Sequence, residues 1–273
     1  LSTLEVWYVQ IGLVELGPFF GKNAAAAGSL HDAAIVERGR GRIVDKPPLV
    51  YHFRECAPAW AGLIHTFFAR YRQSISADRR QLFDRFTFED LGVKIVGVGS
   101  VGTRCTVSLF LSDDADPLFL QIKEARRSVL EPPESRSRYA HQGERVAVGQ
   151  RLMQAAADIF LGWAEVPGSR DYYVRRLHDA KISIALETLG ARALLEYGAA
   201  CGWALARAHA KAGDAPAISG YLGTGDRFDR AVAAYAAAYA DQVERDYQTF
   251  VQAIASGRLA AEGGDFAPVD FGP

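Results

Sequence analysis

Several residue types that mark particular protein classes are scarce in this chain of 273 residues. Only three cysteines occur, Cys56, Cys105 and Cys201, and their odd number and wide separation argue against a disulfide framework or a cysteine-based metal site. There is no signal peptide, no apolar run of membrane-spanning length and no strongly basic run, and the net charge is −1. We therefore expect a cytoplasmic protein that binds neither membranes nor nucleic acid.

A starting methionine is also missing. Leu1 lies inside an apolar pattern of helical spacing that continues to about Leu16, so we expect the chain to be a fragment of a longer protein. A second helical pattern runs from about Ala59 to Phe86. Between these patterns, Gly39-Arg40-Gly41-Arg42 is either a phosphate-binding patch or a solvated loop, and its surroundings favour the loop.

The middle of the chain changes from helical spacing to the alternation typical of strands. The predicted order is three strands, one helix and two further strands, at about residues 92–98, 104–112 and 117–123, then 137–157, then 159–163 and 172–177. This order predicts an α+β fold in which a small antiparallel sheet of five strands carries one helix and is flanked by helical segments.

Two long helical patterns follow. The first runs from Ala191 to Lys211 and ends before Gly213. The second, from about Asp226 to Ser256, carries an aromatic stripe that we expect to lie in a core. We therefore divide the chain into a helical segment at 1–90, a sheet-bearing lobe at 91–179, a second helical segment at 180–257 and a mobile tail at 258–273.

The loop between the first two strands, Gly97-Val98-Gly99-Ser100-Val101-Gly102, is the most informative motif. Glycines let backbone N–H groups approach phosphate oxygens, and Ser100 adds a hydroxyl at the tip. A strand follows this loop, whereas a dinucleotide-binding loop opens a helix, so a ribose-binding role for Asp116 is disfavoured. The remaining interpretations are a tight structural hairpin and the flap that covers ATP phosphates in kinase-like folds.

The next strand adds a lysine to this loop. Lys123 ends an otherwise apolar strand, where burial without an anionic partner would be costly. In kinase-like sheets the third strand carries the lysine that holds the α- and β-phosphates, and a glutamate on the following helix orients it. Glu144 is the candidate for that glutamate, with Glu131 and Glu134 as rivals outside the helix. The alternative for Lys123 is an edge-strand lysine that reaches water.

After the fifth strand, Leu177 and His178 occupy the place where a linker backbone would hydrogen-bond an adenine edge, although the His178 side chain also fits an ordinary surface histidine. The histidines show no metal-ligand spacing. Phosphoryl transfer also needs a catalytic aspartate followed by a metal-binding asparagine, and a second metal-binding aspartate. The only asparagine is Asn23, upstream of the sheet, and Asp214 is better explained as a cap or turn residue. The catalytic set in this chain is therefore incomplete.

Longer blocks of the sequence resemble a known family. The blocks are VGVGSVGTRC from Val96, DPLFLQIKEA from Asp116, GQRLMQAAADIFLGW from Gly149, CGWALARAHAKAGD from Cys201 and GYLG from Gly220. They resemble the carboxy-terminal part of an uncharacterised bacterial family, domain-of-unknown-function family 2252, and the resemblance extends from about Leu4 to Leu259. Members of that family usually carry, nearer the amino terminus, a Gly-Asp-x-His-x-x-Asn-Phe-Gly block and an Asp-Phe-Asp block. Those blocks resemble the catalytic loop and metal-binding aspartate of aminoglycoside-phosphotransferase-like kinases, and neither occurs here.

The resemblance implies a kinase-like fold that is permuted and incomplete in this chain. We accordingly expect part of an ATP-binding phosphotransferase that acts on an unknown small-molecule acceptor, with Mg bound mainly by residues outside the chain. Gln121 departs from kinases, which usually have a small alanine two residues before the lysine, and this leaves open whether the base is adenine. The alternatives are a non-catalytic nucleotide-binding regulatory module and a structural protein that interacts through its helices. The sequence does not indicate an oligomeric state.

Overall fold

The computed structural model describes residues 24–26, 34–37, 40–52, 58–96, 102–131, 137–166, 168, 170–177, 182–184 and 186–260. These residues form two compact units, one that extends to Ala208 and one that begins at His209.

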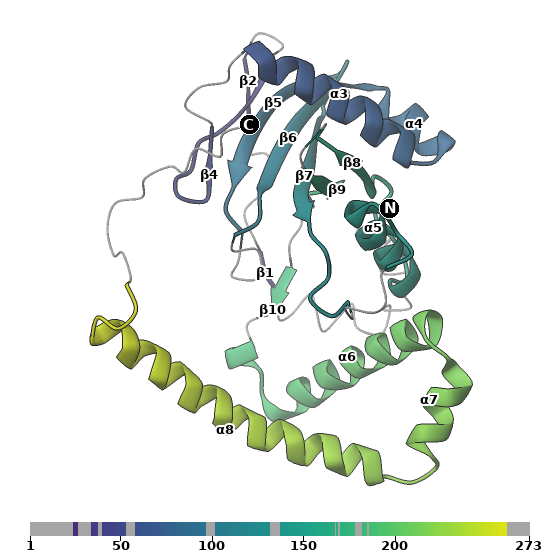
Figure 1. Cartoon of the computed structure of the whole chain (residues 1–273), viewed down its shortest axis with the longest axis vertical. Coiled ribbons are helices and arrows are strands. Elements are labelled where there is room, and N and C mark those ends of the chain that lie inside the picture. Colours follow the sequence, from purple (N-terminus) through teal and green to yellow (C-terminus); the bar gives the residue numbers. More distant parts are fainter. Residues whose placement is uncertain are drawn as a thin grey trace. The chain divides into compact units, whose positions relative to one another are not determined.

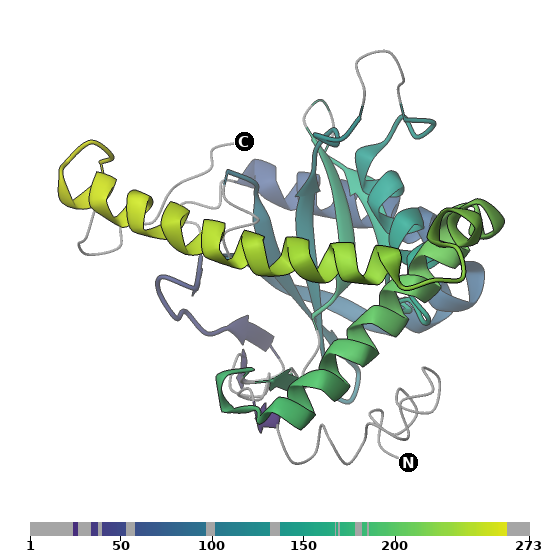
Figure 2. The ribbon, with the colours of Figure 1, turned by 90° about the horizontal axis from the view of Figure 1, so that it is seen from below.

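The first unit is an α+β fold built on a curled, antiparallel sheet of six strands in the order β4-β5-β6-β7-β9-β8, whose strands lie side by side in both views (Figures 1 and 2). These strands are β4 (Val50–Tyr51), β5 (Phe86–Lys94), β6 (Cys105–Ser112), β7 (Pro117–Ala125), β8 (Gly162–Glu165) and β9 (Asp171–Arg176). The predicted order of three strands, one helix and two strands is confirmed, as is the strand that follows Gly102. The predicted number of five strands is wrong, because β4 pairs with β5 and adds a sixth strand at the edge of the sheet.

The first long strand begins earlier than its sequence pattern predicts. β5 starts at Phe86 and not at Gly92, and its pairing with β6 shifts register between Phe88 and Asp90. A bulge inserts an extra residue and so breaks the alternation of side chains. For this reason the alternating pattern becomes visible only after the bulge.

Helices and smaller sheets complete the chain. The first unit contains α3 (Pro58–Ser74), α4 (Ala77–Phe83), α5 (Gln142–Met153), the 3-10 turn η4 (Leu186–Thr188) and most of α6 (Ala191–Ala212), together with the strand pairs β2 (Ala34–Glu37) with β3 (Arg40–Ile43) and β1 (Ala24–Ala26) with β10 (Ile182–Ile184). The second unit contains α7 (Ala215–Leu222) and α8 (Arg227–Ala255).

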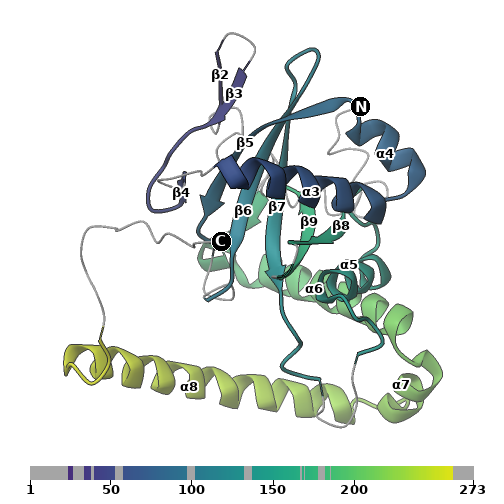
Figure 3. The same cartoon turned by 45° about the horizontal axis from the view of Figure 1, so that its top comes forward.

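The main core lies between α3 and one face of the sheet, which we call the α3 face (Figure 3). The Phe68 ring meets the ring of Phe110 on β6 edge to face, with centroids 4.9 Å apart. Tyr71 is fully buried, and its hydroxyl donates a hydrogen bond to the Phe160 carbonyl over 2.6 Å. Burial of these aromatic side chains, together with the aliphatic residues of the same cluster, stabilises this unit by removing apolar surface from water.

The opposite face of the sheet packs against β3 over a smaller apolar cluster that includes Ile43, Leu109 and Phe119. A Cβ at Gly41 would lie 2.8 Å from Cδ2 of Leu109, so a larger residue here would force the buried Leu109 side chain to shift. The expectation of a solvated loop here is therefore wrong, because residues 40–43 form a paired strand whose inner side is buried.

Helix α5 packs closely on β9. A Cβ at Gly143 would lie 2.2 Å from the carbonyl oxygen of Tyr172, and Ala147, one turn later, is fully buried. His141 caps the start of this helix, because its Nδ1 accepts a hydrogen bond from the backbone N–H of Glu144. The helix is thereby fixed beside the β8–β9 hairpin.

Near the carboxyl end, the observed helix boundaries agree with those predicted from the sequence. α6 ends directly before Gly213, and Asp214 caps α7 by accepting from the Ala217 N–H, as its interpretation as a cap residue predicted. The aromatic stripe of α8 differs from expectation: its side chains are exposed, and the rings of Tyr235 and Tyr239 stack on each other on the helix surface. Among the described helices, none combines the length and apolar character needed to cross a bilayer.

Candidate functional site

A row of side chains crosses the sheet next to the glycine loop. Cys105 of β6 lies opposite Lys123 of β7, Lys123 lies opposite Tyr173 of β9, and Tyr173 lies opposite Trp163 of β8. The β5–β6 register, continued by one residue, puts Lys94 opposite Cys105. Residues directly opposite each other in antiparallel strands point to the same side of a sheet. We call these five side chains the Lys123 row, and they lie on the face opposite α3.

The pKa of the Cys105 thiol depends on the charges around this row. The thiol is buried, and burial raises its pKa, whereas the positive charges of Lys123, Lys94 and Arg175 act in the opposite direction. Three cations therefore lie close enough to one thiol to influence its protonation. Such a cluster of positive charge on a sheet face favours an anionic ligand.

Arg175 is held in place by a neutral side chain. Gln121 is 2% exposed, and its Oε1 accepts from Nε and Nη2 of Arg175 over 3.2 and 3.0 Å. The Nε2 of Gln121 donates to Sγ of Cys105 over 3.4 Å, so both ends of the amide make a hydrogen bond. Because an amide carries no charge, this pairing orients the guanidinium and leaves its positive charge uncompensated.

Lys123 itself is half-buried and forms no hydrogen bond or ion pair with any other residue in the described ranges. The predicted partner, Glu144, lies in the first turn of α5, but the two residues form no ion pair within 4.0 Å among the described residues. An ammonium that is partly removed from water gains free energy from an anion placed beside it. The row therefore offers a cation that an anionic ligand can pair.

Only the end of the predicted phosphate-binding loop lies within the described residues. Gly97, Val98, Gly99 and Ser100 fall outside them. Gly102 has a φ of 75°, in the left-handed region that favours glycine.

A buried carboxylate anchors that end of the loop. Glu124, whose side chain is 2% exposed, accepts from Nε of Arg126 over 2.6 Å, and Nη2 of the same arginine donates to the carbonyl oxygen of Gly102. Arg170 and the backbone N–H of Arg104 also donate to Glu124, over 2.9 and 3.0 Å. Burial raises the pKa of Glu124, but these hydrogen bonds outweigh burial and hold the pKa below its ordinary value.

The residues predicted to contact an adenine edge are only partly described. Leu177 packs against the smaller apolar cluster, and its backbone N–H donates to the carbonyl oxygen of Phe119 over 2.9 Å. His178 lies outside the described residues, so its role stays a prediction.

Sequence reasoning identified Lys123 but missed its companions. Lys94 directly precedes the loop region, and Arg175 lies one strand away, opposite Gln121. Alternation along the strands could have indicated them, because side chains two residues apart in a strand point to the same face of the sheet. By this rule Lys94 and Arg175 point to the face that carries Lys123. The missing information was the register between strands that are far apart in the chain.

A family model described as "Uncharacterized protein conserved in bacteria (DUF2252)" matches residues 22–253. No curated protein and no solved structure matches the chain.

Proposed function

This chain belongs to the bacterial DUF2252 family, whose description names no activity. We therefore propose a function from the geometry of the site: the Lys123 row binds the phosphates of a nucleotide such as ATP. In this proposal the first unit contains the nucleotide-binding lobe of a kinase-like phosphotransferase. The single observation that carries it is the half-buried Lys123 ammonium, which forms no hydrogen bond or ion pair with another described residue and has two further cations nearby.

The order of the elements supports the same proposal. A glycine-rich connection joins the first two strands, the third strand carries Lys123, and a helix with Glu144 in its first turn comes before the last two strands. In kinases a glycine-rich loop covers the phosphates, a lysine on the third strand contacts them, and a glutamate on the following helix positions that lysine. We propose these roles for Gly97, Gly99, Ser100 and Gly102, for Lys123 and for Glu144.

The residues of this chain would bind and orient the nucleotide. Lys123 and Arg175 would pair with phosphate oxygens, and Gln121 would keep the guanidinium of Arg175 aimed at the same face. Magnesium, when bound, would neutralise charge on the phosphates, and we assign its ligands to residues outside this chain. The base that activates the acceptor, and the acceptor itself, are likewise not assigned to described residues.

Gln121 changes how the base would be held. Its side chain fills the region next to Cys105 and is tied to Arg175, where a small residue would leave room for a flat ring. We therefore propose that recognition rests on the phosphates, and that the base is held less specifically than in kinases with alanine at this position.

A thermal-shift series tests this proposal. Mg·ATP and tripolyphosphate are expected to raise the melting temperature of the wild-type protein, whereas adenosine is not, because only the first two carry the phosphates. Lys123→Ala is expected to lose the shift, and Lys211→Ala, a lysine on α6 outside the row, is expected to keep it. The proposal fails if the wild type shows no shift with ATP or tripolyphosphate, or if Lys123→Ala shifts as the wild type does.

The alternative of a regulatory module predicts the same binding without chemistry. Incubating the wild type with Mg·ATP and a panel of small-molecule acceptors separates the two functions. Formation of ADP or of a phosphorylated acceptor, lost in Lys123→Ala, supports the phosphotransferase. Binding with no turnover under any of these conditions favours the regulatory module.

A further inference from the structure

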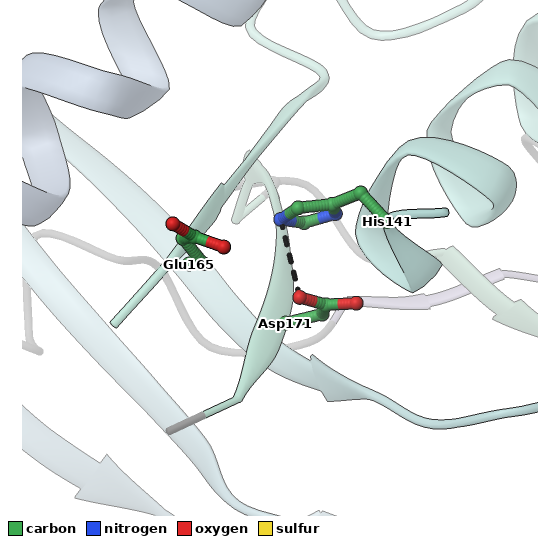
Figure 4. Close-up of side chains that lie close together, drawn as sticks. All are labelled: His141, Glu165 and Asp171. Atoms are coloured by element: carbon green, nitrogen blue, oxygen red, sulfur yellow. Dashed lines mark ion pairs between the residues drawn. The ribbon is translucent and has the colours of Figure 1, made fainter. Parts of the chain in front are cut away.

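A second cluster of chemically active side chains lies where the start of α5 meets the β8–β9 hairpin, and it shares no residue with the Lys123 row. His141 at the helix cap, Glu165 at the end of β8 and Asp171 at the start of β9 each turn one ligand atom toward the others, and these atoms lie within 4.8 Å of one another (Figure 4). Imidazole nitrogen and carboxylate oxygens are the ligands that zinc, manganese and ferrous iron take in proteins.

The two carboxylates lie directly opposite each other, and Arg70 offsets the negative charge only at Glu165. Glu165 and Asp171 are direct partners in the β8–β9 pairing, and like charges placed opposite each other destabilise a sheet. One oxygen of Asp171 is already held by the backbone N–H of Gln142 over 2.6 Å, which fixes the carboxylate and turns its other oxygen toward His141. Glu165, half exposed, pairs with Arg70 of α3.

The imidazole is aimed into this cluster by its role as a cap. Nδ1 of His141 accepts from the Glu144 N–H over 3.2 Å, so Nε2 faces the carboxylates. Nε2 is buried and makes no hydrogen bond, because its distance of 3.5 Å to Oδ1 of Asp171 is too long for one. Two ligand atoms that are each about 2.1 Å from a tetrahedral zinc ion lie roughly 3.4 Å apart. The gap at Nε2 therefore fits a shared metal ion better than a direct hydrogen bond.

We propose that His141, Glu165 and Asp171 bind one divalent transition-metal ion, with water at the remaining position. Nε2 binds as a lone-pair donor, so the ring proton moves to Nδ1 and the cap bond from the Glu144 N–H is given up. Glu165 exchanges Arg70 for the ion by a rotation of its exposed side chain.

The ion would join the start of α5 to the β8–β9 hairpin. This inference does not depend on nucleotide binding, because none of the three ligands belongs to the Lys123 row. A metal ion that binds the folded chain but not the unfolded chain stabilises the fold by mass action. Metal binding can therefore be measured without any enzymatic activity.

Zinc titration by calorimetry, on protein first dialysed against a chelator, tests the site. His141→Asn is the most informative variant, because asparagine keeps a side-chain acceptor for the cap and removes the ring nitrogens. Asp171→Asn and Glu165→Gln each remove a charge and keep the shape. His65→Ala, an exposed histidine of α3, is the matched control.

We expect the wild type and His65→Ala to bind one zinc ion per chain, and each of the three site variants to bind it about tenfold more weakly or worse. Circular dichroism in the absence of zinc identifies any variant that fails to fold, and the remaining variants then carry the test. The proposal is contradicted if the wild type binds no zinc, or if folded His141→Asn and Asp171→Asn variants bind it as tightly as the wild type.

Discussion

At the scale of single residues, Glu124 determines how firmly the end of the glycine loop is attached to the sheet. Its carboxylate accepts from Arg126, Arg170 and the backbone of Arg104, and Arg126 reaches on to Gly102. We expect Glu124→Gln to lower the free energy of unfolding by about 2 kcal/mol, since it removes charged hydrogen bonds while both arginines remain partly in water.

The pH dependence of this loss follows from the lowered pKa of Glu124. A carboxyl whose pKa is lower in the folded state stabilises the fold above its unfolded pKa, and that contribution disappears as the pH falls through the folded pKa. Urea unfolding of the wild type and the variant should therefore differ most near neutral pH and converge in acid. A constant difference down to strongly acidic pH would contradict this account.

His52 provides a second pH-dependent contact, with the opposite sign. Its Nδ1 and Nε2 contact Asp45 and Asp90 over 2.7 and 2.9 Å, and the hydrogen bond to Asp90 raises the pKa of His52 against the opposing effect of burial. The stabilisation is complete below the unfolded pKa of about 6.5 and is lost as the pH rises through the folded pKa.

Replacing this histidine measures that contribution. His52→Gln should cost about 1–2 kcal/mol at pH 6, and the difference from the wild type should shrink as the pH is raised above the folded pKa. Chemical denaturation at several pH values, with His65→Ala as the exposed control, checks the trend. A difference that grows with rising pH would rule out a charged His52 in the fold.

At the scale of elements, two glycines of α5 offer a matched pair. A Cβ at Gly143 would lie 2.2 Å from the Tyr172 carbonyl oxygen, whereas nothing lies within 4 Å of a Cβ at Gly149. Gly143→Ala should therefore push the helix off β9 and cost about 2–3 kcal/mol, while Gly149→Ala should be neutral or gain up to about 1 kcal/mol. Thermal melts of both variants decide this, and equal effects would mean that α5 does not pack as described.

The sequence predicted these elements where the information is local. Apolar alternation in β6 and β7 and helical spacing in α6 and α8 depend on neighbouring residues, so their existence was predictable. The early start of β5 was hidden by its bulge, and β3 was hidden because the buried position of Gly41 depends on Leu109, far along the chain. Spacing places the stripe of α8 on one face of the helix, but spacing alone does not determine what covers that face.

The candidate site was predictable in part for the same reason. Lys123 stood out because a charge at the end of an apolar strand is locally unusual. Lys94 and Arg175 join it only through strand register, and His141, Glu165 and Asp171 meet only through the packing of α5 on the β8–β9 hairpin. Contacts between segments that are far apart in the sequence bring the residues of both clusters together, and no local sequence pattern predicts such contacts.

At the scale of the whole molecule, the near-neutral net charge of −1 conceals an uneven distribution. Cations gather on one face of the sheet in the first unit, next to the end of the glycine loop. If this face attracts phosphates, binding should weaken as salt is raised, because exposed charges are screened within about 10 Å at 0.1 M ionic strength. Affinity for ATP measured from low to moderate salt checks this, and an affinity independent of salt would argue against phosphate recognition.

Calorimetric titration of Mg·ATP into the 273-residue protein at low salt tests the central claim most directly. The comparison is between the wild type, Lys123→Ala and the control Lys211→Ala. The account predicts saturable binding to the wild type and the control, weakened by about tenfold or more in Lys123→Ala. No binding to the wild type, or equal affinity for wild type and Lys123→Ala, would contradict it.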